Sequence, residues 1–224
     1  MSRVRVVPSD RSDVGEVVDI MSTAFFDDPV CRWFFPDEAQ RETQHPPFFW
    51  PLVEVAYAHG EVYLTDDRTG AALWLPVDVS ACRTRTPDIA RMFEGSVGRS
   101  SAARIGALGA RSAEIHPMSI NHDYLPLIAV RPEWQGTGHG AALLDHRHAA
   151  LDQRGRAAYL TASNQRSAKF YERFGYRRLA VTIDVPGGPS LYPMWRNPVS
   201  PDLEARVHDA SGGSGSGSGT ARRC

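Results

Sequence analysis

Residues 127–144 read LIAVRPEWQGTGHGAALL, and this stretch combines a strand, a glycine-rich turn and a helix. The apolar run before Arg131 is typical of a buried strand, and an apolar helix face begins after the last glycine. Gly136, Gly138 and Gly140 let backbone N–H groups turn inward, because no side chain obstructs them. The helix adds unpaired N–H groups and the positive end of its dipole. The stretch therefore predicts a seat for a phosphate group.

Two common phosphate-binding signatures do not fit this stretch. The nucleoside-triphosphate loop needs Gly-Lys followed by Ser or Thr, and no lysine is present here. The dinucleotide fingerprint GxGxxG follows its strand directly, whereas here residues 131–135 intervene and the third glycine comes one residue early. From the loop alone, a glycine-rich connection without a ligand remains the alternative.

A second informative stretch, residues 158–176, reads AYLTASNQRSAKFYERFGY. It is typical of a strand, a turn and a helix, with Asn164 placed to cap the first helical turn and Gly175 to end the last. Phe170 and Phe174 lie one turn apart and are expected to pack together. Tyr171 lies off that pair, and the helix alone favours a core tyrosine.

Together the two stretches resemble the GNAT superfamily of acyl-CoA-dependent N-acyltransferases. The spacing Gln135-x-x-Gly138-x-Gly140 is similar to the family's pyrophosphate-binding signature, and the Asn164 turn with its Phe-Tyr-Glu helix is similar to a second family motif. The resemblance covers about residues 4–196. Within the family, the chain looks most similar to actinobacterial antibiotic acetyltransferases of the puromycin N-acetyltransferase type.

The resemblance implies a fold, a co-substrate and a mechanism. The fold is a single α/β domain whose central mixed, splayed sheet is flanked by helices, and Pro126 is compatible with the splay or with an edge strand. Acetyl-CoA is the implied co-substrate, and Tyr171 is implied to protonate the departing CoA thiolate. The implied cofactor-binding residues are Ile128, Ala129, Val130, Gln135, Gly136, Thr137, Gly138, His139, Gly140 and Asn164.

The general base is less clearly marked. Many family members place Glu or His on the strand before the phosphate loop, and strand alternation puts His122 and Tyr124 on one face with Pro126 and Ile128. His122 and Tyr124 are therefore candidate catalytic residues, and a surface or capping histidine is the alternative for His122. Asp123 and Glu114 are weaker candidates, and His139 is expected to act mainly through its backbone.

The expected acceptor is a primary amine of a small molecule or a peptide. Without a clear carboxylate base, an α-amine with a pKa near ~7.8 is expected to react more readily than a lysine-like amine near ~10.4. A protein or peptide N-terminal acetyltransferase and a non-catalytic acyl-CoA-binding regulator remain as alternatives.

Strands and helices alternate along the chain, which is typical of a mixed α/β sheet. Residues 1–198 are predicted to form the catalytic domain, and residues 199–224 a flexible Gly/Ser-rich tail. Strands are expected at 4–7, 61–65, 71–75, 124–130 and 157–161, with a closing hairpin at 179–185 and 191–195. Helices are expected at 14–25, 48–58, 138–154 and 165–174, with an interrupted helical region at 87–114. The aromatic residues of 31–36 and 48–50 are expected either in the core or in the acceptor pocket.

Composition excludes several other classes of function. The 224 residues carry a formal net charge of -1, which gives no reason to expect a nucleic-acid or anionic-membrane partner. Three cysteines form no disulfide framework, no metal cluster is indicated, and no segment is typical of a signal peptide or a membrane span. A cytoplasmic monomer or homodimer is expected.

Overall fold

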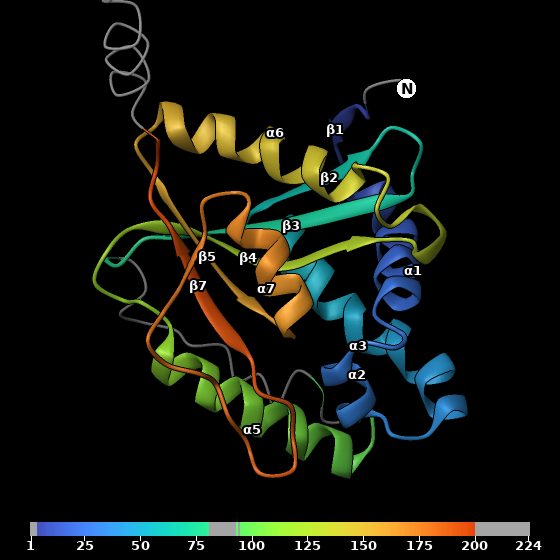
Figure 1. Cartoon of the computed structure of the whole chain (residues 1–224). Coiled ribbons are helices and arrows are strands. Elements are labelled where there is room, and N and C mark those ends of the chain that lie inside the picture. Colours follow the sequence, from blue (N-terminus) through green and yellow to red (C-terminus); the bar gives the residue numbers. More distant parts are fainter. Residues whose placement is uncertain (1–3, 81–92, 94, 200–224) are drawn as a thin grey trace, which may run out of the picture.

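The computed structural model describes residues 4–80, 93 and 95–199, and its centre is a seven-stranded sheet (Figure 1). Residues 87–92 and 94 of the predicted helical region, and the predicted tail beyond residue 199, lie outside the described residues. The strand order is β1-β2-β3-β4-β5-β7-β6. The strands are β1 (Val6–Pro8), β2 (Glu61–Thr65), β3 (Gly70–Val77), β4 (His122–Val130), β5 (Ala157–Ala162), β6 (Arg177–Arg178) and β7 (Tyr192–Arg196).

The join between β4 and β5 is parallel and short. It pairs residues 122–125 with residues 157–160, although both strands continue further. The other strand pairs of the sheet are antiparallel. The two central strands therefore diverge from Pro126 onward, which confirms the splayed sheet expected from the resemblance.

A β-bulge in β4 changes which face its side chains occupy. Leu73 pairs with Leu127 but Leu75 pairs with Tyr124, so two residues of β4 lie opposite one residue of β3. As a result, Leu125 and Ile128 pack with one core cluster, whereas Leu127 packs with the other. The prediction that His122, Tyr124, Pro126 and Ile128 share one face is therefore wrong, because the extra residue reverses the alternation.

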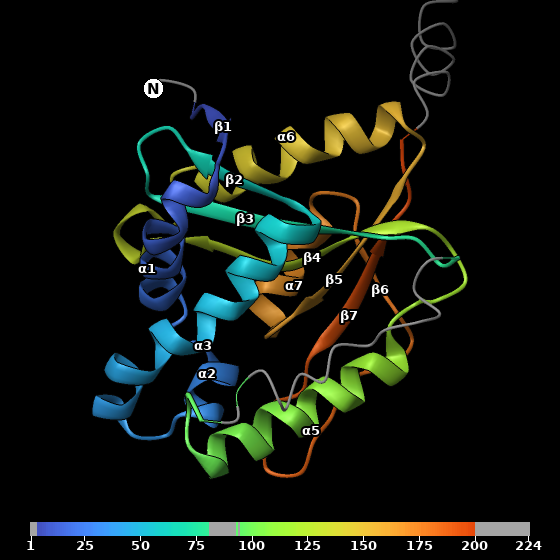
Figure 2. The same ribbon diagram turned by 180° about the vertical axis from the view of Figure 1, so that it is seen from behind.

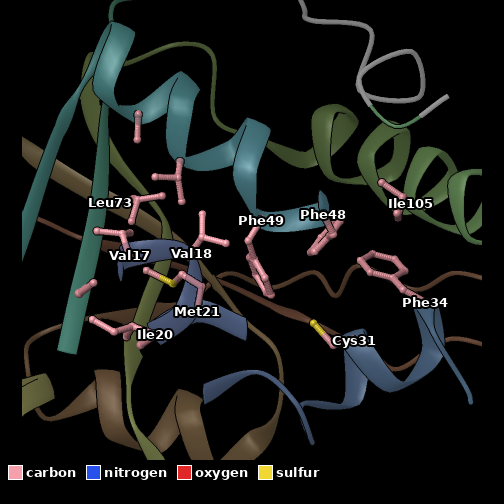
Figure 3. Packing of buried hydrophobic residues seen from close by; sticks show 14 of the residues in the cluster. Val17, Val18, Ile20, Met21, Cys31, Phe34, Phe48, Phe49, Leu73 and Ile105 are labelled. Atoms are coloured by element: carbon pink, nitrogen blue, oxygen red, sulfur yellow. The ribbon is translucent and has the colours of Figure 1, made fainter. Parts of the chain in front are cut away.

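Helices cover both faces of the sheet (Figures 1 and 2). α6 (His139–Gln153) and α7 (Gln165–Glu172) lie on one face, and α1 (Val14–Ala24) and α3 (Glu38–His59) on the other. α2 (Pro29–Phe34) and α5 (Arg99–Ile115) extend the second layer. Figure 3 shows how Val17 and Met21 of α1, Phe48 and Phe49 of α3 and Phe34 of α2 pack in that layer's core.

The third helix starts ten residues earlier than the prediction of 48–58. Asp37 caps it by accepting from the Gln40 N–H at 2.9 Å, and Pro46, Pro47 and Pro51 lie inside it. Each proline lacks a backbone N–H and therefore removes one helical hydrogen bond. The proline itself has no N–H that would need another acceptor. The buried residues Arg41, His45, Phe48, Phe49, Val53 and Ala56 hold the helix against its neighbours, so packing outweighs the low helix propensity.

The closing hairpin is also less regular than predicted. Residues 179–185 form no continuous strand, and Ile183 makes a single bridge with Leu191. Asp184 instead accepts from the hydroxyls of Thr182 and Ser190, so side chains hold this turn. Val181 and Thr182 are exposed, which leaves Ile183 as the buried anchor of the segment.

Candidate active site

A cleft of ≈ 1060 Å³ lies where β4 and β5 diverge, with α6 and α7 on one side and the end of α1 and the start of α2 on the other. The glycine-rich turn lines it through Gln135, Gly136, Gly138 and Gly140. Its other lining residues are Thr23, Ala24, Phe25, Asp27, Asp28, Pro29, Leu125, Pro126, Ile128, Ala129, Val130, Pro132, Trp134, Ala141, Leu160, Thr161, Ser163, Asn164, Arg166, Ser167, Lys169, Phe170, Tyr171 and Arg173.

The glycine-rich turn has the geometry of an anion seat. Gly136 and Gly138 have φ angles of +80° and +100°, and a Cβ atom on either would meet nothing within 4 Å. Gly138 is the N-cap of α6, and no side chain caps the first N–H groups of that helix. The backbone is therefore open toward the cleft at the positive end of the helix dipole.

The side chain of Gln135 points back to the sheet. Its Nε2 donates to the Val130 carbonyl at 3.1 Å, which ties the turn to the end of β4. Gly140 lies against α7, where a Cβ atom would be 3.3 Å from Phe170 Cζ. The two residues thus fix the turn between the strand before it and the helix beside it.

His139 turns away from the cleft and holds the turn to the β2–β3 hairpin. Its imidazole is buried, with Nε2–H donating to Asp67 Oδ2 at 2.7 Å and Nδ1 lying 2.7 Å from Thr137 Oγ1. Burial alone raises the pKa of Asp67, but the hydrogen bonds from His139 and Thr69 outweigh it and lower the pKa to about 2. Sequence reasoning assigned His139 mainly a backbone role and missed this contact.

Asp67→Asn is expected to raise the KM for acetyl-CoA several-fold, roughly 3- to 10-fold, with kcat nearly unchanged. The substitution removes the charged acceptor that holds His139 and hence the turn. Asp66→Asn is the matched control, because Asp66 lies in the same hairpin and its side chain pairs, among the residues that the structure describes, with the exposed Arg5 at 3.3 Å. Equal KM values for the two variants would contradict the positioning role.

The same pair has a pH signature. The pKa of Asp67 is lower in the folded chain than its ordinary value of 3.8, so the folded state binds the proton less tightly. The stability that the pair contributes is therefore fully present above about pH 4 and is lost as the pH falls toward 2. The Asp67→Asn variant is expected to have a lower free energy of unfolding than the wild type above about pH 4. Its free energy of unfolding should also decrease less as the pH falls toward 2.

Tyr171 lies on α7 and lines the cleft. Its hydroxyl has no hydrogen-bond partner among the described residues, so it is available to a bound molecule. Burial, followed by the negative charge of Asp28, raises the pKa of Tyr171 above its ordinary value. The phenol is therefore protonated at neutral pH, as a proton donor must be.

The helix that carries Tyr171 is built as expected. Asn164 caps it, accepting from the Ser167 N–H at 2.9 Å, and Gly175 follows it with a φ of +83°. The Phe170 and Phe174 rings lie 5.0 Å apart, which confirms the predicted pair. These local contacts fix the direction in which α7 presents Tyr171.

Asp28 brings a carboxylate to the same cleft from a part of the chain that is distant in sequence. It is the N-cap of α2, and its Oδ1 accepts from the Val30 N–H at 2.8 Å. Its Oδ2 accepts from the Ser163 hydroxyl at 2.6 Å, and Ser163 immediately follows β5. Burial raises the pKa of Asp28. Sequence reasoning missed this residue, because Asp-Pro at a helix start signals only a cap.

His122 and Tyr124 are not among the residues that line the cleft. His122 is fully buried, with Nδ1–H donating to Ile120 O at 2.8 Å and Nε2 lying 3.0 Å from His116 Nε2. The Tyr124 ring packs edge-on against His116, and burial raises its pKa while lowering that of His122. The structure therefore does not bring this pair together with Tyr171.

The two weaker candidates for the base have structural partners. Asp123 is buried between Arg147 and Arg156 and accepts hydrogen bonds from both. Glu114 is exposed and pairs with Arg111 at 2.6 Å. Neither lines the cleft.

Three cations of α7 and its C-cap also line the cleft, and sequence reasoning did not single them out. Arg166 and Lys169 lie on the helix, and Arg173 is the C-cap that follows it. CoA is polyanionic, so a cationic wall beside the phosphate seat suits it. Their spacing of three and four residues could have indicated in the sequence that they share one side of a helix.

Known proteins match both the sequence motifs and the whole fold. Residues 101–178 match the family model described as an acetyltransferase (GNAT) domain. A Corynebacterium glutamicum structure, described as histone acetyltransferase HPA2 and related acetyltransferase, is 26% identical, with a TM-score of 0.65 over 89% of this chain and 99% of that one. Arylalkylamine N-acetyltransferase 2 from Aedes aegypti is 13% identical, with a TM-score of 0.66 over 88% and 99%. The Drosophila melanogaster polyamine N-acetyltransferase is 13% identical, with a TM-score of 0.58 over 87% and 100%.

The fold, the cleft and the matches to known proteins together define a transferase of acetyl groups. The residues that match the acetyltransferase (GNAT) domain model, 101–178, include the glycine-rich turn and α7. The chain is an N-acetyltransferase, and its co-substrate is acetyl-CoA. In the part of the chain that the structure describes, no helix is long and apolar enough to cross a membrane, and no group of three or more His, Cys, Asp or Glu residues could hold a metal ion.

Proposed function

We propose that the chain transfers the acetyl group of acetyl-CoA to a primary amine of a small molecule by direct transfer within a ternary complex. The observation that carries this proposal is that one cleft joins the glycine-rich turn to Tyr171. Two structural neighbours support the acceptor class, since their names specify arylalkylamine and polyamine acceptors. An aminoacyl antibiotic is one small amine of this class.

Each part of the cleft has a proposed role. Gln135–Gly140 bind the pyrophosphate, and the backbone of residues 128–130, which diverges from β5, pairs with the pantetheine arm. Acetyl-CoA supplies the activated acyl group. Tyr171 donates a proton to the sulfur of the departing CoA thiolate. Asn164 caps the helix that carries Tyr171.

His122 stays a prediction for the general base. Its burial outside the cleft means that it acts on an amine only through intervening groups. The expected preference for weakly basic amines rested on the absence of a clear glutamate on the central strand, and it stays a prediction. Asp27 and Asp28 line the cleft from outside that strand, so carboxylates are present at the site.

An amine panel tests the proposed function. Free CoA thiol is measured with acetyl-CoA and alkylamines, arylalkylamines, polyamines, aminoacyl nucleosides and short peptides with free N-termini. Thiol release with small amines above the peptide rate is expected. Faster release with peptides favours the N-terminal acetyltransferase, and thermal stabilisation by acetyl-CoA with no release from any amine favours the non-catalytic regulator.

A further inference from the structure

The short helix α2 lies with its start in the cleft. Its N-cap Asp28 and its first residue Pro29 both line the cleft. The helix has only six residues, Pro29–Phe34, and a helix of this length is not stable in water by itself. Contacts with the rest of the chain therefore decide where α2 lies, and with it the position of this wall of the cleft.

The end of α2 is held by two side chains of α5. Arg104 Nη1 donates to the Trp33 carbonyl at 3.0 Å and to the Phe34 carbonyl at 3.2 Å. Ser101 is buried, and its hydroxyl donates to the Phe34 carbonyl at 2.9 Å. The last carbonyls of a helix have no partner within the helix, so these side chains supply partners that α2 lacks.

Arg41 of α3 holds the two carbonyls that follow. Its Nη1 donates to the Phe35 and Pro36 carbonyls, at 3.0 Å each, and the residue is only 4% exposed. Its guanidinium carbon also lies 5.0 Å from the centre of the Phe26 ring. Phe26 precedes α2 and Pro36 follows it, so one buried side chain contacts the chain on both sides of the helix.

These contacts form a clamp, which consists of the side chains of Arg41, Ser101 and Arg104 on the carbonyls of residues 33–36. Two of its members are guanidinium groups, whose hydrogen bonds are about twice as strong as those of neutral donors. Their positive charge is also favourable at the C-terminus of a helix. Since α2 rises only about 9 Å over its six residues, a shift of the clamped end also moves the end in the cleft.

The clamp itself lies outside the cleft, because none of its three side chains is among the lining residues. Its effect on the reaction therefore passes through α2. The start of α2 and the end of α1 lie across the cleft from α6 and α7. In the proposed function, acetyl-CoA lies against the glycine-rich turn and β4, which leaves the side of α1 and α2 for the amine.

We propose that Arg41, Ser101 and Arg104 are positioning residues for the amine acceptor. By clamping α2, they keep its first residues as a fixed wall that orients the amine toward the acetyl group. This inference rests on the proposed function. It makes a clamp outside the cleft one determinant of how well the amine is bound and aligned.

A role in stability alone is the competing explanation, because removing a clamp contact lowers the free energy of unfolding in either case. The two roles differ in their kinetics. A stability role lowers the fraction of active enzyme and leaves the KM values of both substrates at those of the wild type. A positioning role raises the KM for the amine, while the KM for acetyl-CoA stays the same.

The test replaces Arg104 with methionine, which removes both hydrogen bonds and keeps an unbranched side chain. Arg104 is only partly buried, unlike Arg41, and is therefore the better position to change. With 2-phenylethylamine and with spermidine as acceptors, kcat/KM for the amine is expected to fall about 10-fold, with a raised amine KM. The KM for acetyl-CoA and the thermal shift that acetyl-CoA gives should stay within about 2-fold of the wild-type values.

Three further variants sharpen the test. Ser101→Ala removes one neutral hydrogen bond and should raise the amine KM by about 2- to 3-fold, and it carries the test if Arg104→Met does not fold. Arg104→Lys keeps a charged donor and should lie closer to the wild type than Arg104→Met. Arg111→Met is the matched control. Arg111 lies on the same helix, is exposed and pairs with Glu114 at 2.6 Å, so both KM values should stay within about 2-fold.

The failure of this inference is distinguishable from the failure of the proposed function. A wild-type amine KM in both Arg104→Met and Ser101→Ala would overturn the positioning role and leave the amine acetyltransferase in place. An equal rise in the KM for acetyl-CoA, an equal loss in Arg111→Met, or an Arg104→Lys variant as impaired as Arg104→Met would overturn it as well. Release of CoA thiol with neither amine in the wild-type chain contradicts the small-amine function itself.

Discussion

Replacing Tyr171 with phenylalanine is expected to lower kcat about 100-fold or more, while acetyl-CoA binds as tightly as before. The substitution removes one hydroxyl and keeps the ring. Because the pKa of Tyr171 is raised by burial and by the charge of Asp28, the wild-type phenol stays protonated well into alkaline solution. Activity is therefore expected to fall on the alkaline side only above about pH 10.

Tyr176→Phe is the control for this variant. Tyr176 belongs to the same core cluster, its ring lies 5.9 Å from that of Tyr171, and its hydroxyl bonds to His148 Nε2 at 3.0 Å. Its loss is expected to lower stability by about 1 kcal/mol without changing kcat. Turnover near the wild-type value in Tyr171→Phe would make that tyrosine structural and assign the proton to water.

Gly138→Glu is expected to abolish the thermal stabilisation that acetyl-CoA gives the wild-type chain. A side chain here projects into the open space that the pyrophosphate needs, and the carboxylate adds like-charge repulsion. Ligand linkage contributes RT ln(1 + [L]/Kd), about 2.7 kcal/mol when acetyl-CoA is at 100 times its Kd. Thermal shift with and without acetyl-CoA measures the effect, with NAD and ATP as ligands that should shift the wild type much less.

Strain from the left-handed backbone needs its own control, since glutamate at φ +100° is unfavourable whatever it contacts. Gly155→Glu provides it. Gly155 has a φ of +61°, also has open space around a Cβ, and lies after the far end of α6. Both variants should lose stability, but only Gly155→Glu should keep the acetyl-CoA shift. An unchanged shift in Gly138→Glu would remove the pyrophosphate assignment.

Local signals in the sequence predicted the phosphate turn and α7 closely. Asn164, Gly175 and the Phe170–Phe174 pair act within a few residues of one another, so their pattern is visible along the chain. The same holds for β2, whose bounds of Glu61–Thr65 match the prediction.

Features that depend on distant contacts were missed. The bulge in β4 comes from pairing with β3, which lies some fifty residues earlier, and it moved His122 away from the face of Ile128. The prolines of α3 signalled a helix start, but the buried aromatic residues around them kept the helix continuous. Asp28 joins the site through Ser163, which is 135 residues away, and no local pattern reports such a contact.

The short join between β4 and β5 also has a mechanical consequence. Four residue pairs connect the part of the sheet that carries the phosphate turn to the part that precedes α7, whereas seven pairs connect β3 to β4. At its closed end the join is braced by Asp123, which links Arg147 of α6 to Arg156 just before β5. A molecule lying in the open end touches both parts at once. We therefore expect bound acetyl-CoA to connect the two parts of the sheet, so that the chain is stiffer along this join with the ligand than without it.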